Sequence, residues 1–326
     1  MAPFIGWVEF ILLRMSSAEP LNAFGCLRIM KTIVIAGASG FVGENLNAFF
    51  NLKGWRVCSI GRANADATWS DQSSIIRVLE NADALVNLSG KSVNCRFTHK
   101  NVQELITSRV HTTSALGDAI ALCKNPPPIW INASGASIYR DDVKNANTED
   151  SPVDGTGTMA QVARLWEHAL NECQTPHTRK VALRISLVLG NSGGVYPTFR
   201  MLTRMLQGGP QGDGSQMMSW IHITDLSRLV YTLVNHKNPP AEVNAAAPQP
   251  LTNKIFMQQF RSSLKVGLGI GAPAWLIKMG TALLGVDSEL VLRGMYVVSA
   301  RTQALEFQFE YPTLDAALSN LGDKNA

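Results

Sequence analysis

The fold is decided by the stretch Thr32-Ile-Val-Ile-Ala-Gly-Ala-Ser-Gly-Phe-Val-Gly43. Its first part is a short run rich in β-branched side chains, which predicts a buried strand over residues 32–36. A glycine-rich turn follows, and the pattern after it predicts a helix over Phe41–Leu52. A strand that leads through a glycine turn into a helix is typical of the first unit of a nucleotide-binding α/β domain.

The three glycines of the turn have separate roles. Gly37 permits the tight turn, Gly40 lets the backbone approach a pyrophosphate, and Gly43 packs the helix against the strand. The free N–H groups and partial positive charge of the helix N-terminus favour a phosphate there. An NAD site would place a carboxylate about twenty residues further on, but residues 45–65 contain none, and Arg62 stands in that region. Because an arginine can pair with a 2′-phosphate, we expect NADP rather than NAD; an exposed, solvated Arg62 is the alternative.

Strands and helices continue to alternate along the chain. Further strands are predicted at Arg56–Ile60, Ala84–Leu88, Ile129–Ala133 and Val181–Leu189, and a long helix at about residues 100–123. This alternation predicts an α/β protein with a doubly wound parallel sheet, the Rossmann fold, and a small, mainly helical C-terminal domain. The expected divisions are a disordered leader or overlong start at residues 1–29, a nucleotide-binding domain at 30–248 and a substrate-side domain at 249–326.

Composition and charge favour a soluble enzyme. Of the 326 residues 46% are apolar, and 29 Lys and Arg stand against 25 Asp and Glu without a run of five like charges, so we expect a small-molecule substrate and no nucleic acid. The apolar stretch Phe4–Leu13 is too short to span a bilayer, and we expect no membrane partner. Five scattered cysteines favour a reducing, cytoplasmic location, with organellar targeting by the leader left open. The oligomeric state is left open as well.

Several short motifs follow the glycine turn in a fixed order. They are Asn87-Leu88-Ser89-Gly90, Thr107-Ser108-Arg109, Leu165-Trp166-Glu167, Leu183-Arg184, Val188-Leu189-Gly190, Gly208-Gly209-Pro210, Ser219-Trp220-Ile221-His222-Ile223 with Asp225, and Asn244 with Ala247-Pro248. With these motifs the chain resembles the NAD(P)-binding "epimerase family" group of the extended short-chain dehydrogenase/reductase superfamily. Pro273-Ala274 and the closing Tyr311-Pro312 resemble the small C-terminal domain of that group, so the resemblance covers roughly residues 31–322.

The resemblance implies a set of cofactor contacts. They are Gly37, Ser39, Gly40, Phe41, Val42 and Gly43 at the turn, Gly61 and Arg62 at the adenosine phosphate, Leu88 and Ser89 along the fourth strand, Glu104 and Arg109 on the following helix, and Val188 at the end of the sixth strand. For Arg109 a salt bridge on the helix surface is the alternative.

The superfamily's usual catalytic pair is missing. Its hydride chemistry rests on a tyrosine with a lysine four residues later, and none of the tyrosines at 139, 196, 231, 296 and 311 has that lysine. The resemblance places Met159 and Ala163 at those positions. Tyr139 and Ser134 are therefore the candidate catalytic residues, with packing as the alternative role for Tyr139.

The sequence thus predicts an oxidoreductase or epimerase-like protein that binds NADP and acts on an unidentified small carbonyl or sugar-type substrate. A non-catalytic sensor of nicotinamide nucleotides is the alternative. His222 and Asp225 are interpreted as a structural histidine and a capping or dipole residue, because no clustered histidines or cysteines point to a metal.

Overall fold

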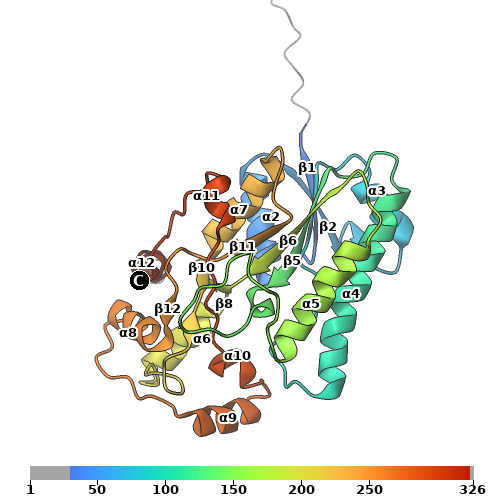
Figure 1. Cartoon of the computed structure of the whole chain (residues 1–326). Helices are drawn as coiled ribbons and strands as arrows, with labels where there is room; N and C mark the ends of the chain where they lie inside the picture. Colours follow the sequence, from blue (N-terminus) through green and yellow to red (C-terminus); the bar gives the residue numbers. More distant parts are fainter. Residues whose placement is uncertain (1–29, 324–326) are drawn as a thin grey trace, which may run out of the picture. The chain divides into compact units, whose positions relative to one another are not determined.

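Seven parallel strands form the central sheet of residues 30–323, which are the residues that this computed structural model describes (Figure 1). The expected leader at residues 1–29 lies outside them. The strand order is β11-β6-β5-β4-β1-β2-β3. The bounds are β1 Thr32–Ala36, β2 Arg56–Gly61, β3 Ala67–Thr68, β4 Ala84–Asn87, β5 Ile129–Gly135, β6 Arg179–Ile185 and β11 Glu242–Ala245. The chain adds β2 and β3 on one side of β1 and then β4, β5, β6 and β11 on the other side. This reversal at β1 confirms the predicted doubly wound sheet.

Helices cover both faces of this sheet. Alternate residues of β1 show the division, because Ile33 and Ile35 belong to one buried cluster and Val34 and Ala36 to another. The first cluster packs under α2 and α7, and the second packs under α3, α4 and α5. The helix bounds are α2 Phe41–Leu52, α3 Gln72–Leu79, α4 His99–Leu122, α5 Thr158–Glu172 and α7 Ile223–Asn235.

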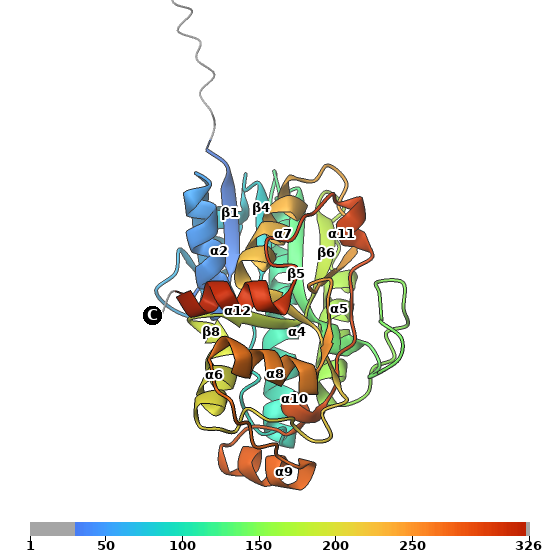
Figure 2. The same cartoon turned by 90° about the vertical axis from the view of Figure 1, so that its left-hand side faces the viewer.

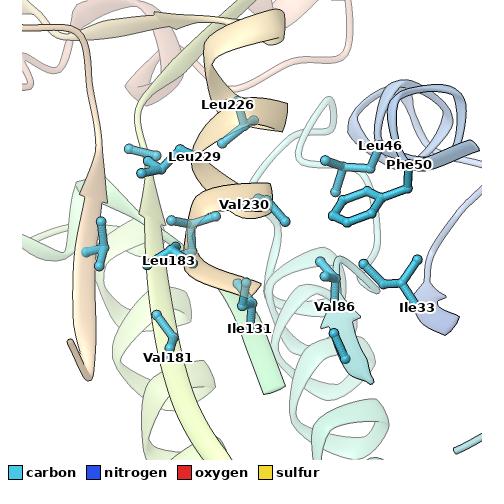
Figure 3. Close-up of a cluster of buried hydrophobic side chains, with 14 of the residues drawn as sticks. Ile33, Leu46, Phe50, Val86, Ile131, Val181, Leu183, Leu226, Leu229 and Val230 are labelled. Carbon is cyan, nitrogen blue, oxygen red and sulfur yellow. The ribbon is translucent and has the colours of Figure 1, made fainter. Parts of the chain in front are cut away.

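Figure 3 shows the core between α2, α7 and the sheet. Leu46 and Phe50 point from α2, and Leu226 and Leu229 from α7, toward branched side chains of the strands. All four helical side chains are 0% exposed. Burial of one such side chain stabilises a fold by about 1.5–3 kcal/mol, so this layer holds the central sheet rigid beneath its loops.

The structure divides the single strand predicted over Val181–Leu189. β6 ends at Ile185, and β7 (Leu187–Gly190) joins a second sheet with β8 (Gly193–Gly194) and β10 (Trp220–His222). Ser186 makes the break, because its backbone N–H and its hydroxyl both donate to the carbonyl oxygen of Ala245. The sequence had suggested that Val188 lies at the end of the sixth strand. In the structure Val188 lies in β7 instead. A third, two-stranded sheet pairs β9 (Met217–Met218) with β12 (Leu251–Thr252).

The C-terminal region is mainly helical, as predicted. It contains α8 Asn253–Ser263, α9 Ala274–Leu283, α10 Glu289–Leu292, α11 Arg301–Ala304 and α12 Leu314–Asp323. A separate apolar cluster joins α8 and α12 to α6 (Tyr196–Arg204) and β10, through residues that include Phe199, Trp220 and Phe260. The cluster draws on residues from both sides of the boundary expected near residue 248, and that boundary stays a prediction.

The carboxyl ends of the sheet strands point toward α6, α8, α9 and α10 (Figures 1 and 2). In doubly wound sheets ligands bind beyond these strand ends, so the candidate site is sought there. No helix within residues 30–323 combines the length and the apolar character needed to cross a bilayer.

Candidate functional site

The turn between β1 and α2 has the backbone that its glycines require. Gly37 has φ +83°, and its N–H donates to the carbonyl oxygen of Ile60 at 3.0 Å. A Cβ at Gly43 would lie 2.4 Å from the oxygen of Gly37, so only glycine fits. A Cβ at Gly40 would meet only that same oxygen, at 3.5 Å, which leaves the space in front of Gly40 open.

The N-terminus of α2 is available to a ligand. Gly40 is its N-cap, and no side chain caps the helix. Ser39 beside it is exposed. The first N–H groups of a helix otherwise take a side-chain acceptor, so an uncapped start next to open space fits an anionic group.

The end of β4 lies against the turn. A Cβ at Gly37 would lie 3.0–3.1 Å from backbone atoms of Leu88 and Ser89. Ser89 is 5% exposed, and its hydroxyl is a buried polar atom without a hydrogen-bond partner among the described residues. Such a group is expensive to leave unpaired, which indicates that something outside the described residues is its partner.

Arg109 lies next to the same strand end. It is 8% exposed, and a Cβ at Gly90 would be 2.9 Å from its guanidinium carbon. Its Nη1 donates to the carbonyl oxygen of Leu105, and its guanidinium stacks 5.0 Å from the Trp166 ring centre. No carboxylate within residues 30–323 forms an ion pair with it, so the surface salt bridge considered above is not present. Burial lowers the pKa of Arg109 to about 10, and it remains a cation at neutral pH.

Two other predicted cofactor contacts, Arg62 and Glu104, are exposed at the surface. Arg62 follows Gly61 at the end of β2, is exposed and has no ion pair among the described residues. Glu104 is exposed and pairs with Lys91, whose hydrogen bond and charge lower the pKa of the Glu104 carboxyl. The turn, Leu88, Ser89 and Arg109 are therefore brought together, whereas Glu104 already has a protein partner.

Phe41 and Val188 both lie next to Gly194 of the β7–β8 hairpin: a Cβ there would be 3.1 Å from the Phe41 ring and 2.1 Å from the Val188 carbonyl oxygen. A Cβ at Gly190 or Gly193 would lie 2.6 or 2.5 Å from the Phe41 ring, so the β7–β8 hairpin lies directly on that ring. Val188 lies in β7, paired with Ile221 of β10. The side chain of Val42 is half-buried at the same helix start.

Ser134 belongs to a buried ion-pair network at the ends of β5 and β6. Its hydroxyl donates to Glu167 Oε1 at 2.6 Å. Arg184 donates to both oxygens of the same carboxylate, at 2.8 Å each. Burial alone would lower the pKa of Arg184, but its hydrogen bonds to Glu167 and the charge of that carboxylate raise it above its usual value.

Tyr139 extends this network to β11. Its hydroxyl accepts from Arg184 Nη1 at 2.7 Å and donates to Asn244 Oδ1 at 2.9 Å. The backbone N–H of Asn244 in turn donates to the Glu149 carboxylate at 2.8 Å. Burial raises the pKa of Tyr139, and the Arg184 charge opposes the rise. Both catalytic candidates, Tyr139 and Ser134, are thus buried and hydrogen-bonded. Their partners Glu167, Arg184 and Asn244 belong to motifs of the sequence, but the motifs alone did not indicate this role.

An open cavity of about 1270 Å³ lies nearby, between the loop after β5 and the C-terminal region. Residues from four segments line it: 141–144, 156–157, 212–216 and 273–293. Its carboxylates are held by backbone N–H groups; Glu289, for example, accepts from the N–H groups of Thr158 and Met159 at the start of α5. The ammonium groups of Lys144 and Lys278 have no ion pair within the described part of the chain, which leaves the cavity two available cations.

His222 and Asp225 have structural roles. His222 is the N-cap of α7, and its Nδ1 accepts from the N–H of Thr224 at 3.1 Å. Asp225 is fully buried in the first turn of α7, the position expected of a dipole partner, and it accepts from Arg228 Nη1 of that helix. It also accepts from the N–H groups of Glu310 and Tyr311, so it fastens the C-terminal segment as well. Within residues 30–323 no group of three His, Cys, Asp or Glu side chains is placed to hold a metal ion.

The fold and the glycine turn define a class of nucleotide-dependent proteins, and comparison with known families identifies it. Residues 33–246 match the model of the NAD dependent epimerase/dehydratase family, and residues 272–321 match a domain of unknown function, DUF1731. The chain belongs to the NAD dependent epimerase/dehydratase family, which confirms the resemblance found in the sequence.

Particular relatives are similar over nearly the whole chain. "Epimerase family protein SDR39U1" of Mus musculus is 30% identical over 298 residues, covering 89% of this chain and 99% of the relative. "Epimerase family protein SA0724" of Staphylococcus aureus strain N315 is 28% identical over 300 residues, covering 90% and 99%. The crystal structure of human SDR39U1 (isoform 2) with NADPH superposes with a TM-score of 0.82 at 28% identity, covering 90% of this chain and 100% of that one.

Proposed function

We propose that this chain is an NADP(H)-binding oxidoreductase or epimerase that acts on a small carbonyl or sugar-type substrate. The observation that carries the proposal is the pair formed by the unpartnered Ser89 hydroxyl and the buried Arg109 cation beside the phosphate turn. Buried polar groups of this kind are stable when a ligand completes their hydrogen bonds, and an anionic dinucleotide matches both. The NADPH named for the human relative supports the same cofactor.

Each predicted contact has a part in this proposal. The N–H groups at Phe41, Val42 and Gly43, with Ser39 and the open face at Gly40, would hold the pyrophosphate. Exposed Arg62, after Gly61, would pair with the 2′-phosphate that distinguishes NADP from NAD. Leu88, Ser89 and Arg109 would line the next part of the nucleotide, with Val188 and Glu104 at the margins. The bound nicotinamide would supply or accept a hydride.

The substrate would occupy the cavity lined by residues 141–144, which follow Tyr139 in the chain. We infer that Tyr139 and Ser134 support the site rather than transfer the proton, because their hydroxyls already bond to Arg184, Asn244 and Glu167. A substrate that used the Tyr139 hydroxyl would have to break a buried, charge-assisted hydrogen bond. Soluble, cytoplasmic activity is part of the same proposal.

The test has three measurements. Calorimetry should give a lower dissociation constant for NADPH than for NADH, and equal values would contradict the proposed role of Arg62. NADPH oxidation over a panel of aldehydes and ketones should then reveal a reductase. Chromatographic detection of a new epimer from nucleotide sugars, incubated with the protein and oxidised or reduced cofactor, should reveal an epimerase, which consumes no net NADPH.

A non-catalytic nucleotide sensor is the second candidate, favoured by the missing Tyr and Lys pair. Tight NADPH binding without turnover of any panel member would favour it over the enzyme.

A further inference from the structure

Helix α9 has an apolar face that points away from the protein. Ile277 is the only buried residue of this helix. Trp275, Met279 and Leu283 are 65%, 51% and 83% exposed. Their spacing of four residues puts them on one side of the helix. A surface helix of a soluble protein is expected to turn its apolar side toward the core, whereas this side faces outward.

The apolar surface continues onto the preceding segment. Leu268 and Ile270 are each 60% exposed. The N–H of Ile270 donates to the carbonyl oxygen of Leu206 at 2.7 Å, which holds this segment beside the exposed Met205 and Leu206 at the end of α6. We call the side chains of Leu268, Ile270, Trp275, Met279, Leu283 and Leu284 the α9 patch. Large apolar side chains exposed in such number along two successive segments normally mark a surface that binds something.

Cations border the α9 patch beside residues 267–269: a Cβ at Gly269 would lie 2.5 Å from Arg261, and Lys265 lies beside Gly267. The cavity that α9 lines through Ala274 and Lys278 holds carboxylates as well. Residues 253–286 contain Lys254, Arg261, Lys265 and Lys278 and no Asp or Glu. α6 adds Arg200 and Arg204, again without an acidic residue. The carboxylates that follow, Asp287 and Glu289, accept hydrogen bonds from backbone N–H groups. The apolar face is therefore bordered by cations that lack acidic neighbours along their own segments.

We propose that the α9 patch docks on a membrane surface rich in anionic phospholipids. Helices that lie in the bilayer interface typically have tryptophan and leucine on one face, with lysine and arginine around them. The basic border complements anionic headgroups, whereas the surface of a second copy of this chain would present the same cations. Such docking needs no spanning helix. It is opposed to the expectation of no membrane partner, which rested on the short apolar stretch of the sequence.

The position of α9 suits this role. In both views α9 lies at the end of the described fold opposite the start of β1 (Figures 1 and 2). It can contact a flat surface while the central sheet stays in water.

Vesicle co-sedimentation of the full chain tests the proposal. The protein should bind vesicles of equal parts phosphatidylcholine and phosphatidylglycerol, bind phosphatidylcholine alone much less, and be released by salt. Trp275→Glu combined with Leu283→Glu should lower the bound-to-free ratio about tenfold or more. Lys265→Gln should lower it on anionic vesicles alone. The matched control is Leu52→Glu, because Leu52 is 87% exposed but lies at the end of α2.

Unchanged NADPH affinity in these variants shows that they fold. The proposal is wrong if the parent protein does not bind anionic vesicles, or if the double variant binds as well as the Leu52→Glu control. It is also wrong if the parent is a dimer in solution that the double variant converts to a monomer without any vesicle binding, because the patch then belongs to a second copy of this chain.

Discussion

Replacement of Arg109 by methionine should change protein stability and nucleotide affinity in opposite directions. Methionine keeps most of the side chain's length and apolar contact but removes the cation. The structure gives this cation a backbone carbonyl and an aromatic ring as partners, and no carboxylate within the described residues. Burial of the Arg109 charge therefore lowers the stability of the ligand-free protein, and an anionic ligand would offset this cost.

The size of the effect follows from the lowered pKa. A fall from the ordinary 12.5 to about 10 corresponds, at 1.36 kcal/mol for each pKa unit, to about 3 kcal/mol against the charged form. The variant would lose about 1 kcal/mol from the hydrogen bond to Leu105 and about 0.5–2 kcal/mol from the contact with Trp166. The free energy of unfolding without nucleotide should thus rise by about 0–1.5 kcal/mol. NADPH affinity should fall about tenfold or more, because a charge-assisted hydrogen bond contributes about 1.5–3 kcal/mol.

Urea unfolding and calorimetry with NADPH measure the two quantities. Arg184→Met is the matched control: Arg184 is also a buried arginine, but it is paired with Glu167, so its loss should destabilise the protein by about 3–5 kcal/mol. If Arg109→Met lowers stability as Arg184→Met does and leaves NADPH affinity unchanged, the interpretation of Arg109 as an anion ligand is wrong.

Three further predictions concern single side chains. Arg62→Ala should reduce the preference for NADPH over NADH about tenfold or more, while Arg77→Ala, another exposed arginine, leaves it unchanged; calorimetry with both nucleotides decides. Tyr139→Phe should lower the free energy of unfolding by about 1–3 kcal/mol because it removes one partner from Arg184, yet lower turnover less than about tenfold; a loss of 10²–10⁴ at unchanged NADPH affinity would make Tyr139 the proton donor. Asp225→Asn should weaken the attachment of the C-terminal segment, measured as faster hydrogen exchange at residues 305–323, and unchanged exchange would contradict this role.

The sequence was sufficient to predict the sheet core because the signals there are local. β1 and α2 have the predicted bounds, since a strand, three glycines and an amphipathic helix follow one another without interruption. The break at Ser186 could not be predicted, because apolar residues continue on both sides of it and the carbonyl that accepts from Ser186 lies in β11. α3 was also missed, although Asp71, which accepts from the N–H of Ser74, is a local signal for its start.

The candidate site was only partly predictable. The turn and the end of β4 could be placed from motif and order, whereas burial of Arg109 without a carboxylate depends on the packing of α4 against α5. Asp225 was expected to serve its own helix, and it does bind Arg228 there, but its two backbone donors lie 85 and 86 residues further along the chain. No pattern in one sequence indicates which distant backbone a buried carboxylate will bind.

The buried network explains why the missing Tyr and Lys pair leaves a stable fold. In this chain Glu167 balances the charge of Arg184 directly, and Tyr139 accepts a hydrogen bond from Arg184 Nη1 and donates one to Asn244. The polar side chains at the ends of β5, β6 and β11 thus satisfy one another without a substrate. A hydroxyl held between a cation and an amide oxygen is positioned to stabilise three strand ends. It is poorly placed to give its proton to a substrate, because that transfer would leave Asn244 without its donor in a buried site.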